Sequence, residues 1–162
     1  MTFVAGGQPR LEGVPFAVEG DLAATRVARR IIRALKGESF EIAASRKSAY
    51  HAWATMTSPL LLAFLVTLEE AATMAGLTRV QARRRSSSII RQTLENYWHL
   101  GPEHSFSGPI IRGDVSTVAK HLSVLKGNRA VRDAYVALAR LALRKLPAGN
   151  REELLRLLKV RA

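Results

Sequence analysis

Lys47, Tyr50, His51 and Ser58 recur at helical spacing within the long apolar stretch Arg46–Gly76. Residues three or four apart share one face of a helix, so the pattern predicts a polar stripe on an otherwise apolar helix. A lysine among polar neighbours, together with a histidine, suits proton transfer to or from a carbonyl or an alcohol. The alternative is structural: Lys47 reaches solvent at the start of the helix, while Tyr50 and His51 are hydrogen-bonded core residues.

The Arg46–Gly76 stretch is predicted to form one helix that Pro59 kinks, because proline lacks a backbone donor. Its uncharged part is long enough to suggest a membrane span. It also contains several hydroxyl side chains and an imidazole, so we favour a core helix covered by other helices.

A second stretch with chemical potential is Ser107–Leu122, a loop rich in glycine and proline that leads into a helix capped by Asp114. The loop presents Arg112, and the helix carries Thr117 and His121. An arginine near a helix N-terminus suits the binding of a carboxylate or a phosphate. The alternative is a capped turn in which Arg112 pairs with Asp114 or another acid.

The elements before these stretches follow the order strand, helix, strand. Val14–Glu19 and Ser39–Ile42 are predicted strands, and Asp21 is a good N-cap for the helix between them. This order is typical of a parallel sheet. Two strands alone do not make a stable parallel sheet, so we expect the remaining strands to lie outside this chain. The apolar face of the helix is predicted from Leu22, Val27, Ile31 and Leu35.

From Ser45 onward the pattern is wholly helical. Further helices are predicted to begin at Thr78, Asp114, Asn128 and Asn150, and Gly101–Gly113 is predicted to be a loop. In the helix after Asn128, the buried stripe is predicted from Val131, Tyr135, Leu138, and Leu141 or Ala142. The predicted class is therefore mainly α with a short βαβ segment in front.

The chain is basic, with 25 Lys and Arg against 13 Asp and Glu and a net charge of +12. Such a charge attracts phosphates and nucleic acid. The arginines are spread over most of the predicted helices, whereas a nucleic-acid footprint gathers on one face, so we favour a solvated basic surface. The sequence has no cysteine and no zinc, P-loop or GxGxxG motif. We expect a cytoplasmic protein with no metal site and no membrane partner.

Three segments carry a resemblance to a known family: PFAVEGD at Pro15–Asp21, KSAYHA from Lys47, and Ser107–Leu122. With these, the chain resembles the C-terminal part of bacterial two-domain proteins that join a Rossmann-like NADP-binding domain to a helical domain of unknown function. Those proteins belong to the superfamily of 6-phosphogluconate dehydrogenase, β-hydroxyacid dehydrogenases and pyrroline-5-carboxylate reductase.

The resemblance implies two domains. Residues 1–44 would close the Rossmann-like nucleotide domain, and residues 45–162 would form a 6-phosphogluconate dehydrogenase C-terminal-like helical domain that dimerises and walls the substrate cleft. β-Hydroxyacid dehydrogenases have a catalytic lysine at the start of a comparable helix, with an amide residue four positions later. By this analogy Lys47 is the acid/base and His51 its partner, and the substrate-binding residues are Tyr50, Ser58, Arg112, Thr117 and His121.

Two departures limit the analogy. Position 59 is proline where relatives have asparagine, and the glycine-rich phosphate loop of the nucleotide domain is missing. NADP is therefore expected in a full-length protein and not in this chain alone, which we expect to be an inactive C-terminal fragment or a truncated product whose partners are a second copy and the missing Rossmann-like half. The alternative function is a non-enzymatic basic helical module that binds nucleic acid or a protein.

Overall fold

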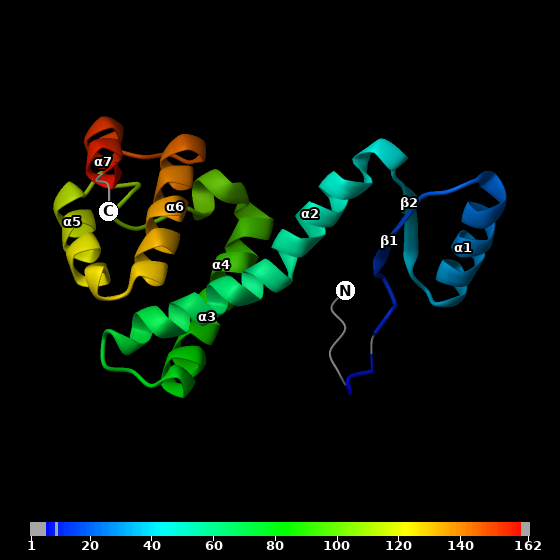
Figure 1. Cartoon of the computed structure of the whole chain (residues 1–162), viewed down its shortest axis with the longest axis horizontal. Helices are drawn as coiled ribbons and strands as arrows, with labels where there is room; N and C mark the ends of the chain where they lie inside the picture. Colours follow the sequence, from blue (N-terminus) through cyan, green and yellow to red (C-terminus); the bar gives the residue numbers. More distant parts are fainter. Residues whose placement is uncertain (1–5, 9, 160–162) are drawn as a thin grey trace. The chain divides into compact units, whose positions relative to one another are not determined.

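The computed structural model describes residues 6–8 and 10–159 of the chain. The chain divides into two compact units, Met1–Leu62 and Ala63–Ala162. Most of the described residues are helical, and the only sheet among them has two parallel strands near the start of the chain (Figure 1). The predicted class, mainly α with a short βαβ segment in front, is confirmed.

The first unit opens with strand β1 (Pro15–Val18), helix α1 (Leu22–Ala34) and strand β2 (Glu38–Glu41). The strands pair in parallel, with Pro15 opposite Glu38 and Val18 opposite Glu41. The side chain of Asp21 accepts a hydrogen bond from the backbone N–H of Ala24 at 2.7 Å, as expected for the N-cap. Both predicted strands and the cap are therefore present.

The buried face of α1 differs from the predicted one. Thr25 and Ile32 are buried, whereas the side chains chosen from their periodicity are exposed: Leu22, Val27, Ile31 and Leu35. A sheet of two strands covers only a narrow part of a helix, so these apolar side chains stay 41% to 81% exposed in the part of the unit that the structure describes. This prediction was wrong for the chain as it stands.

The predicted long helix is divided at Pro59. A short 3-10 turn (Ala44–Arg46) leads into α2 (Lys47–Thr57), and α3 (Pro59–Thr73) follows directly. Ser58, between them, has φ −127° and ψ −74°, outside helical values. The kink that we predict at Pro59 is therefore a complete break between two helices.

The prediction that this region is a buried core helix was wrong. Neither α2 nor α3 contains a buried residue, and Trp53 and Leu62 are 58% and 63% exposed. By length and composition alone, Ala44–Thr73 is also apolar enough to cross a membrane. In the second unit, Phe64, Leu68 and Ala71 of α3 line an apolar cleft with α6.

The second unit continues with α4 (Arg79–Ser105). Thr78 and Gln81 form a reciprocal capping box, which confirms the predicted start. The helix is interrupted at Gly101, whose φ is +75°, and Pro102 begins one further turn that ends at Ser105. The predicted loop at Gly101–Gly113 therefore begins later, at Phe106.

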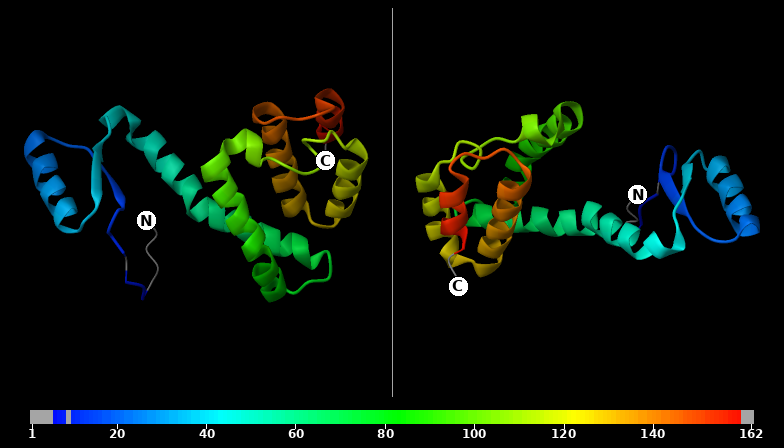
Figure 2. Two further views of the ribbon diagram at one scale, coloured as in Figure 1. Left: turned by 180° about the vertical axis from the view of Figure 1, so that it is seen from behind. Right: turned by 90° about the horizontal axis from the view of Figure 1, so that it is seen from above.

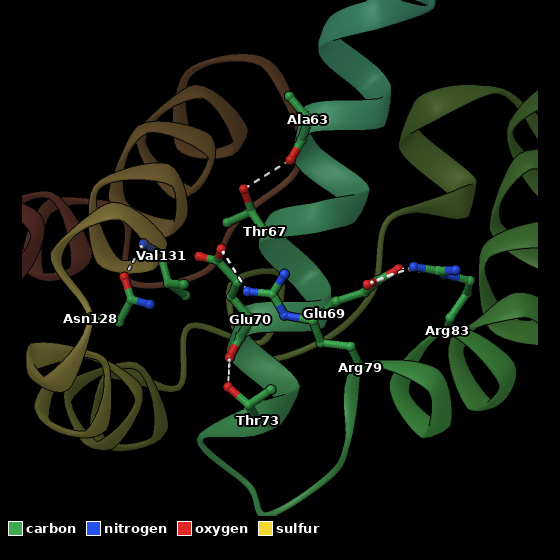
Figure 3. Close-up of polar contacts among 9 residues, drawn as sticks. All are labelled: Ala63, Thr67, Glu69, Glu70, Thr73, Arg79, Arg83, Asn128 and Val131. Carbon is green, nitrogen blue, oxygen red and sulfur yellow. Dashed lines mark hydrogen bonds and ion pairs between the residues drawn. The ribbon is translucent and has the colours of Figure 1, made fainter. Parts of the chain in front are cut away.

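Ion pairs connect α3 and α4 (Figure 3). The guanidinium of Arg83 donates to both carboxylate oxygens of Glu69, at 2.7 and 3.0 Å, and Arg79 lies 3.5 Å from Glu70. The hydrogen bond from Arg83 lowers the pKa of Glu69 below its ordinary value. These contacts fix the helix hairpin through polar groups on its surface.

The core of the second unit lies among α5 (Val115–Val124), α6 (Arg129–Lys145) and α7 (Arg151–Leu158), with a 3-10 turn (Leu125–Gly127) after α5 (Figure 2). Its buried members are Val118, Leu122, Ala139, Leu143, Leu154 and Leu158. The stripe on α6 is rotated from the predicted one: Val131 is buried as expected, but Leu138 and Leu141 are 43% and 52% exposed.

Two glycines bring the loop before α5 against the loop before α7. The N–H of Gly149 donates to the carbonyl of Ile111 at 3.0 Å, and a Cβ on Gly113 would lie 2.7 Å from the carbonyl carbon of Gly149. Asn150 occupies the N-cap position of α7, but its side chain does not cap that helix. Its amide donates instead to the carbonyl of Gly113 at 2.8 Å. The cap predicted at Asn150 is therefore a contact between loops.

Candidate functional site

The polar residues at the start of α2 meet the ends of both strands around a cavity in the first unit. The cavity has a volume of about 400 Å³ and is lined by Ala17, Glu19, Ile42, Lys47, Ser48, Tyr50 and His51. Glu19 and Ile42 directly follow β1 and β2. The carboxyl edge of a parallel sheet is where α/β proteins place their ligands. Three predicted site residues, Lys47, Tyr50 and His51, are thus brought together there.

An ion pair between the strand end and α2 forms one wall of this cavity. The ammonium of Lys47 donates to Oε2 of Glu19 at 2.7 Å, with side-chain exposures of 67% and 27%. Lys47 therefore has a carboxylate partner as well as contact with solvent. Sequence reasoning missed Glu19; the available signal was an acid at the carboxyl end of a parallel strand.

Aromatic contacts position Tyr50 beside the cavity. Its ring lies 5.8 Å from that of Phe40 on β2, in an edge-to-face arrangement, and 5.4 Å from that of Trp53 on α2. Such pairs contribute about 0.5–1.5 kcal/mol beyond their buried area. The contact with Phe40 connects the first turn of α2 to the sheet and so helps to hold the lysine and histidine near the strand ends.

Ser58 does not line this cavity. It lies at the break between α2 and α3, where its carbonyl accepts from the N–H of Leu62 at 3.0 Å. Arg112, Thr117 and His121 belong to the second unit. The structure therefore does not assemble the predicted site residues into one constellation within either unit.

In the second unit, the hydroxyl of Thr117 is already hydrogen-bonded to the carboxylate of Asp114. One carboxylate oxygen of Asp114 accepts from the backbone N–H of Thr117 at 3.0 Å, and the other accepts from its hydroxyl at 2.6 Å. These hydrogen bonds, with one from Ser116 and the nearby charge of Arg112, lower the pKa of Asp114 to about 2. Thr117 thus serves the helix cap, and Arg112 remains exposed beside it.

Because Asp114 caps α5, we expect the stability of the second unit to depend on pH. Because the pKa of Asp114 is about 2 in the folded chain and near 4 when unfolded, its stabilising effect is present above about pH 4 and is lost as the pH falls towards 2. We expect Asp114→Asn to be less stable than the parent at pH 6 and nearly equal to it at pH 2. Urea unfolding across this range measures the effect, with the exposed Asp133→Asn as the control; parallel profiles for parent and Asp114→Asn would contradict it.

His121 pairs with Tyr135 across α5 and α6. Its Nδ1 lies 3.0 Å from the phenol oxygen, and the two rings meet edge to face. Partial burial raises the pKa of Tyr135, and the tautomer of the imidazole decides which of the two groups donates. Tyr135 also lines an apolar cleft of about 270 Å³ between α3 and α6, together with Phe64 and Leu138. The residue that sequence reasoning missed here is Tyr135, which had been assigned only to the core.

No group of three or more His, Asp and Glu side chains in the part of the chain that the structure describes is arranged to hold a metal ion. The carboxyl edge of the two strands is open to a ligand, and its polar groups are an ammonium, a carboxylate, an imidazole and two hydroxyls. Such a set can bind and orient a small polar molecule and exchange protons with it.

The fold and this edge define a mainly helical domain preceded by a βαβ segment. The chain belongs to the DUF2520 family, a domain of unknown function, whose model matches residues 14–142. Neither a curated protein nor a solved structure matches the chain. The matched range includes both strands, the cavity residues and the Arg112–His121 segment.

Proposed function

We propose that the chain is the dimerisation and substrate-cleft portion of an NADP-dependent oxidoreductase-like protein. Its helical part would be related to the C-terminal domains of the 6-phosphogluconate dehydrogenase and pyrroline-5-carboxylate reductase superfamily. The observation that carries the proposal is the cavity at the carboxyl edge of β1 and β2, where Lys47 and His51 lie with Glu19.

In this proposal the ammonium of Lys47 gives a proton to a substrate oxygen or nitrogen, or its amine takes one back in the reverse direction. His51, one helical turn later, orients the substrate or shares the proton. Tyr50 and Ser48 offer hydroxyls to other polar groups of the substrate. Bound NADP would supply the hydride, and the chain's own residues would supply the proton and the orientation.

The open surfaces of the first unit support a Rossmann-like partner half. The sheet has only two strands, β2 has no buried residue, and Val27 and Ile31 of α1 are 49% and 54% exposed. Parallel sheets are ordinarily covered on both faces. Further parallel strands with their helices would cover this apolar surface, and their glycine-rich loop would bring the pyrophosphate site that this chain lacks.

The catalytic role is tested in a longer protein that joins this chain to a Rossmann-like half. We expect Lys47→Ala to lower kcat by about 10²- to 10⁴-fold, the usual contribution of a general acid or base. The matched control is Lys145→Ala, at an exposed position near the end of α6, which should turn over at the parent rate. Unchanged turnover of Lys47→Ala would remove the catalytic role.

The dimer proposal rests on α4, in which only Ala82 is buried among 27 residues. Its exposed apolar side chains include Ile89, Tyr97 and Leu100, which share one face at helical spacing and are 67%, 53% and 54% exposed. Apolar surfaces of this kind mark interfaces between chains. We expect sedimentation equilibrium to show a dimer, and Ile89→Glu to weaken it by at least about tenfold in Kd. Ser88→Glu introduces the same charge one residue away and should leave the dimer intact, whereas a monomeric parent would refute the proposal.

A further inference from the structure

The cavity at the strand ends contains opposite charges that already satisfy each other. Glu19 and Lys47 form an ion pair at 2.7 Å, and the other lining groups, Ser48, Tyr50 and His51, carry hydroxyls and an imidazole. The site therefore presents both a cation and an anion to a ligand, which restricts the ligands that it can accept.

A ligand with a single charge would lie close to a like charge in this cavity. A lone anion on Lys47 would lie within a few ångströms of the Glu19 carboxylate, and a lone cation on Glu19 would face the Lys47 ammonium. In each case two like charges repel at short distance, and the ion pair between Glu19 and Lys47 is broken. A molecule with both charges avoids this penalty, because its carboxylate meets Lys47 while its ammonium meets Glu19.

We propose that this cavity binds a small zwitterion of the α-amino acid class. One ion pair is exchanged for two charge-assisted pairs, so no charge loses its partner when the ligand enters. The proposal names the substrate class of the proposed function and rests on it for any reaction, although binding itself needs neither NADP nor turnover.

The side chains permit such an exchange. Lys47 is 67% exposed on a flexible four-carbon stem, and Glu19 is 27% exposed beside Gly20, whose φ is +147°. The pair can therefore separate by the few ångströms that an amino-acid backbone requires without disturbing β1 or α2. The volume of about 400 Å³ is within the range of small-molecule sites. Ala17, Ile42 and the ring of Tyr50 remain for the apolar part of the ligand.

The experiment titrates the 162-residue chain with L-alanine and follows backbone amide shifts by NMR. Acetate and methylammonium chloride, each at the same ionic strength, carry one charge of the zwitterion apiece. We expect L-alanine to shift the amides of residues 17–20 and 42–51 in a saturable way, and each single-charge probe to bind at least about tenfold more weakly.

Variants separate the pair from general charge effects. Glu19→Gln and Lys47→Met should each weaken L-alanine binding by about tenfold or more. Glu12→Gln removes one carboxylate from another exposed ion pair of the same unit, with Lys36 at 3.7 Å, and should leave binding unchanged. Acetate binding as tightly as L-alanine would show a simple anion site, and an absence of saturable shifts would also overturn the proposal.

The two proposals fail in different ways. If L-alanine binds but the longer protein transfers no hydride to or from any amino acid or its keto or imino counterpart, the zwitterion site stands and the oxidoreductase role falls. If the longer protein oxidises a hydroxy acid that has no ammonium group and L-alanine does not bind, the oxidoreductase role stands and the zwitterion class is refuted.

Discussion

Replacing Gly113 with alanine is expected to lower the free energy of unfolding of the helical unit by about 3 kcal/mol. Two costs combine. The backbone of Gly113 has a φ of +67°, at which alanine is strained. The Cβ of alanine would also lie 2.7 Å from the carbonyl carbon of Gly149 and 2.9 Å from the nitrogen of Asn150. Both opposing atoms are backbone, so no side chain can move aside. Chemical denaturation followed by circular dichroism measures the change.

Gly108 provides the matched control for this substitution. It lies in the same loop and also has a positive φ, +95°, but nothing lies within 4 Å of the position that its Cβ would take. Gly108→Ala therefore reports the strain alone, about 1 kcal/mol. Equal effects of the two substitutions would mean that the close approach of the two loops contributes nothing to stability.

The second large effect is expected in the core, where Leu154→Ala should lower the free energy of unfolding by about 3 kcal/mol. Leu154 has no exposed surface, and it belongs to the same buried cluster as Val118 and Leu143. Removing its side chain takes apolar atoms out of the core and leaves a cavity that helices fixed by short loops cannot close fully.

Leu141→Ala makes the same chemical change on α6 at a position that is 52% exposed, and it should cost less than about 1 kcal/mol. Urea unfolding of both variants tests the comparison. A similar loss at both positions would show that the apolar cluster among α5, α6 and α7 does not dominate the stability of this unit.

Local signals in the sequence predicted much of the fold. Asp21, Thr78, Asp114 and Asn128 each cap the helix that follows, because a short polar side chain before an apolar periodic segment satisfies the first free N–H groups of a helix. Both strands and the break at Pro59 follow from equally local rules.

What the sequence could not provide is the identity of each element's neighbour. Val27 and Ile31 of α1 have the spacing of a buried face, yet they are 49% and 54% exposed among the described residues of the unit. On α6 the buried residues Ala139 and Leu143 lie beside the predicted Leu138 and Leu141, because periodicity defines a stripe but not the direction from which other helices pack. Asn150 had the residue type of a cap, and its hydrogen bond to Gly113 is a tertiary contact that no local rule contains.

Only part of the candidate site could be predicted from the sequence. Helical spacing placed Lys47 and His51 together, since both lie on one short helix. Glu19 is 28 positions before Lys47 in the chain, and only the parallel pairing of β1 and β2 brings the strand end to the start of α2. A shared role of Arg112, Thr117 and His121 with Lys47 stays a prediction, because these three residues belong to the second unit and Lys47 belongs to the first.

The helical folding unit extends beyond the segment that the family model matches, because it includes α7. The family match ends at residue 142, within α6, whereas three of the most deeply buried side chains come later: Leu143, Leu154 and Leu158. A chain that stopped where the match stops would keep the candidate cavity and both informative stretches but lose one wall of its hydrophobic core. The shortest autonomously folding form of the helical unit therefore extends to at least Leu158, beyond the segment by which the family is recognised.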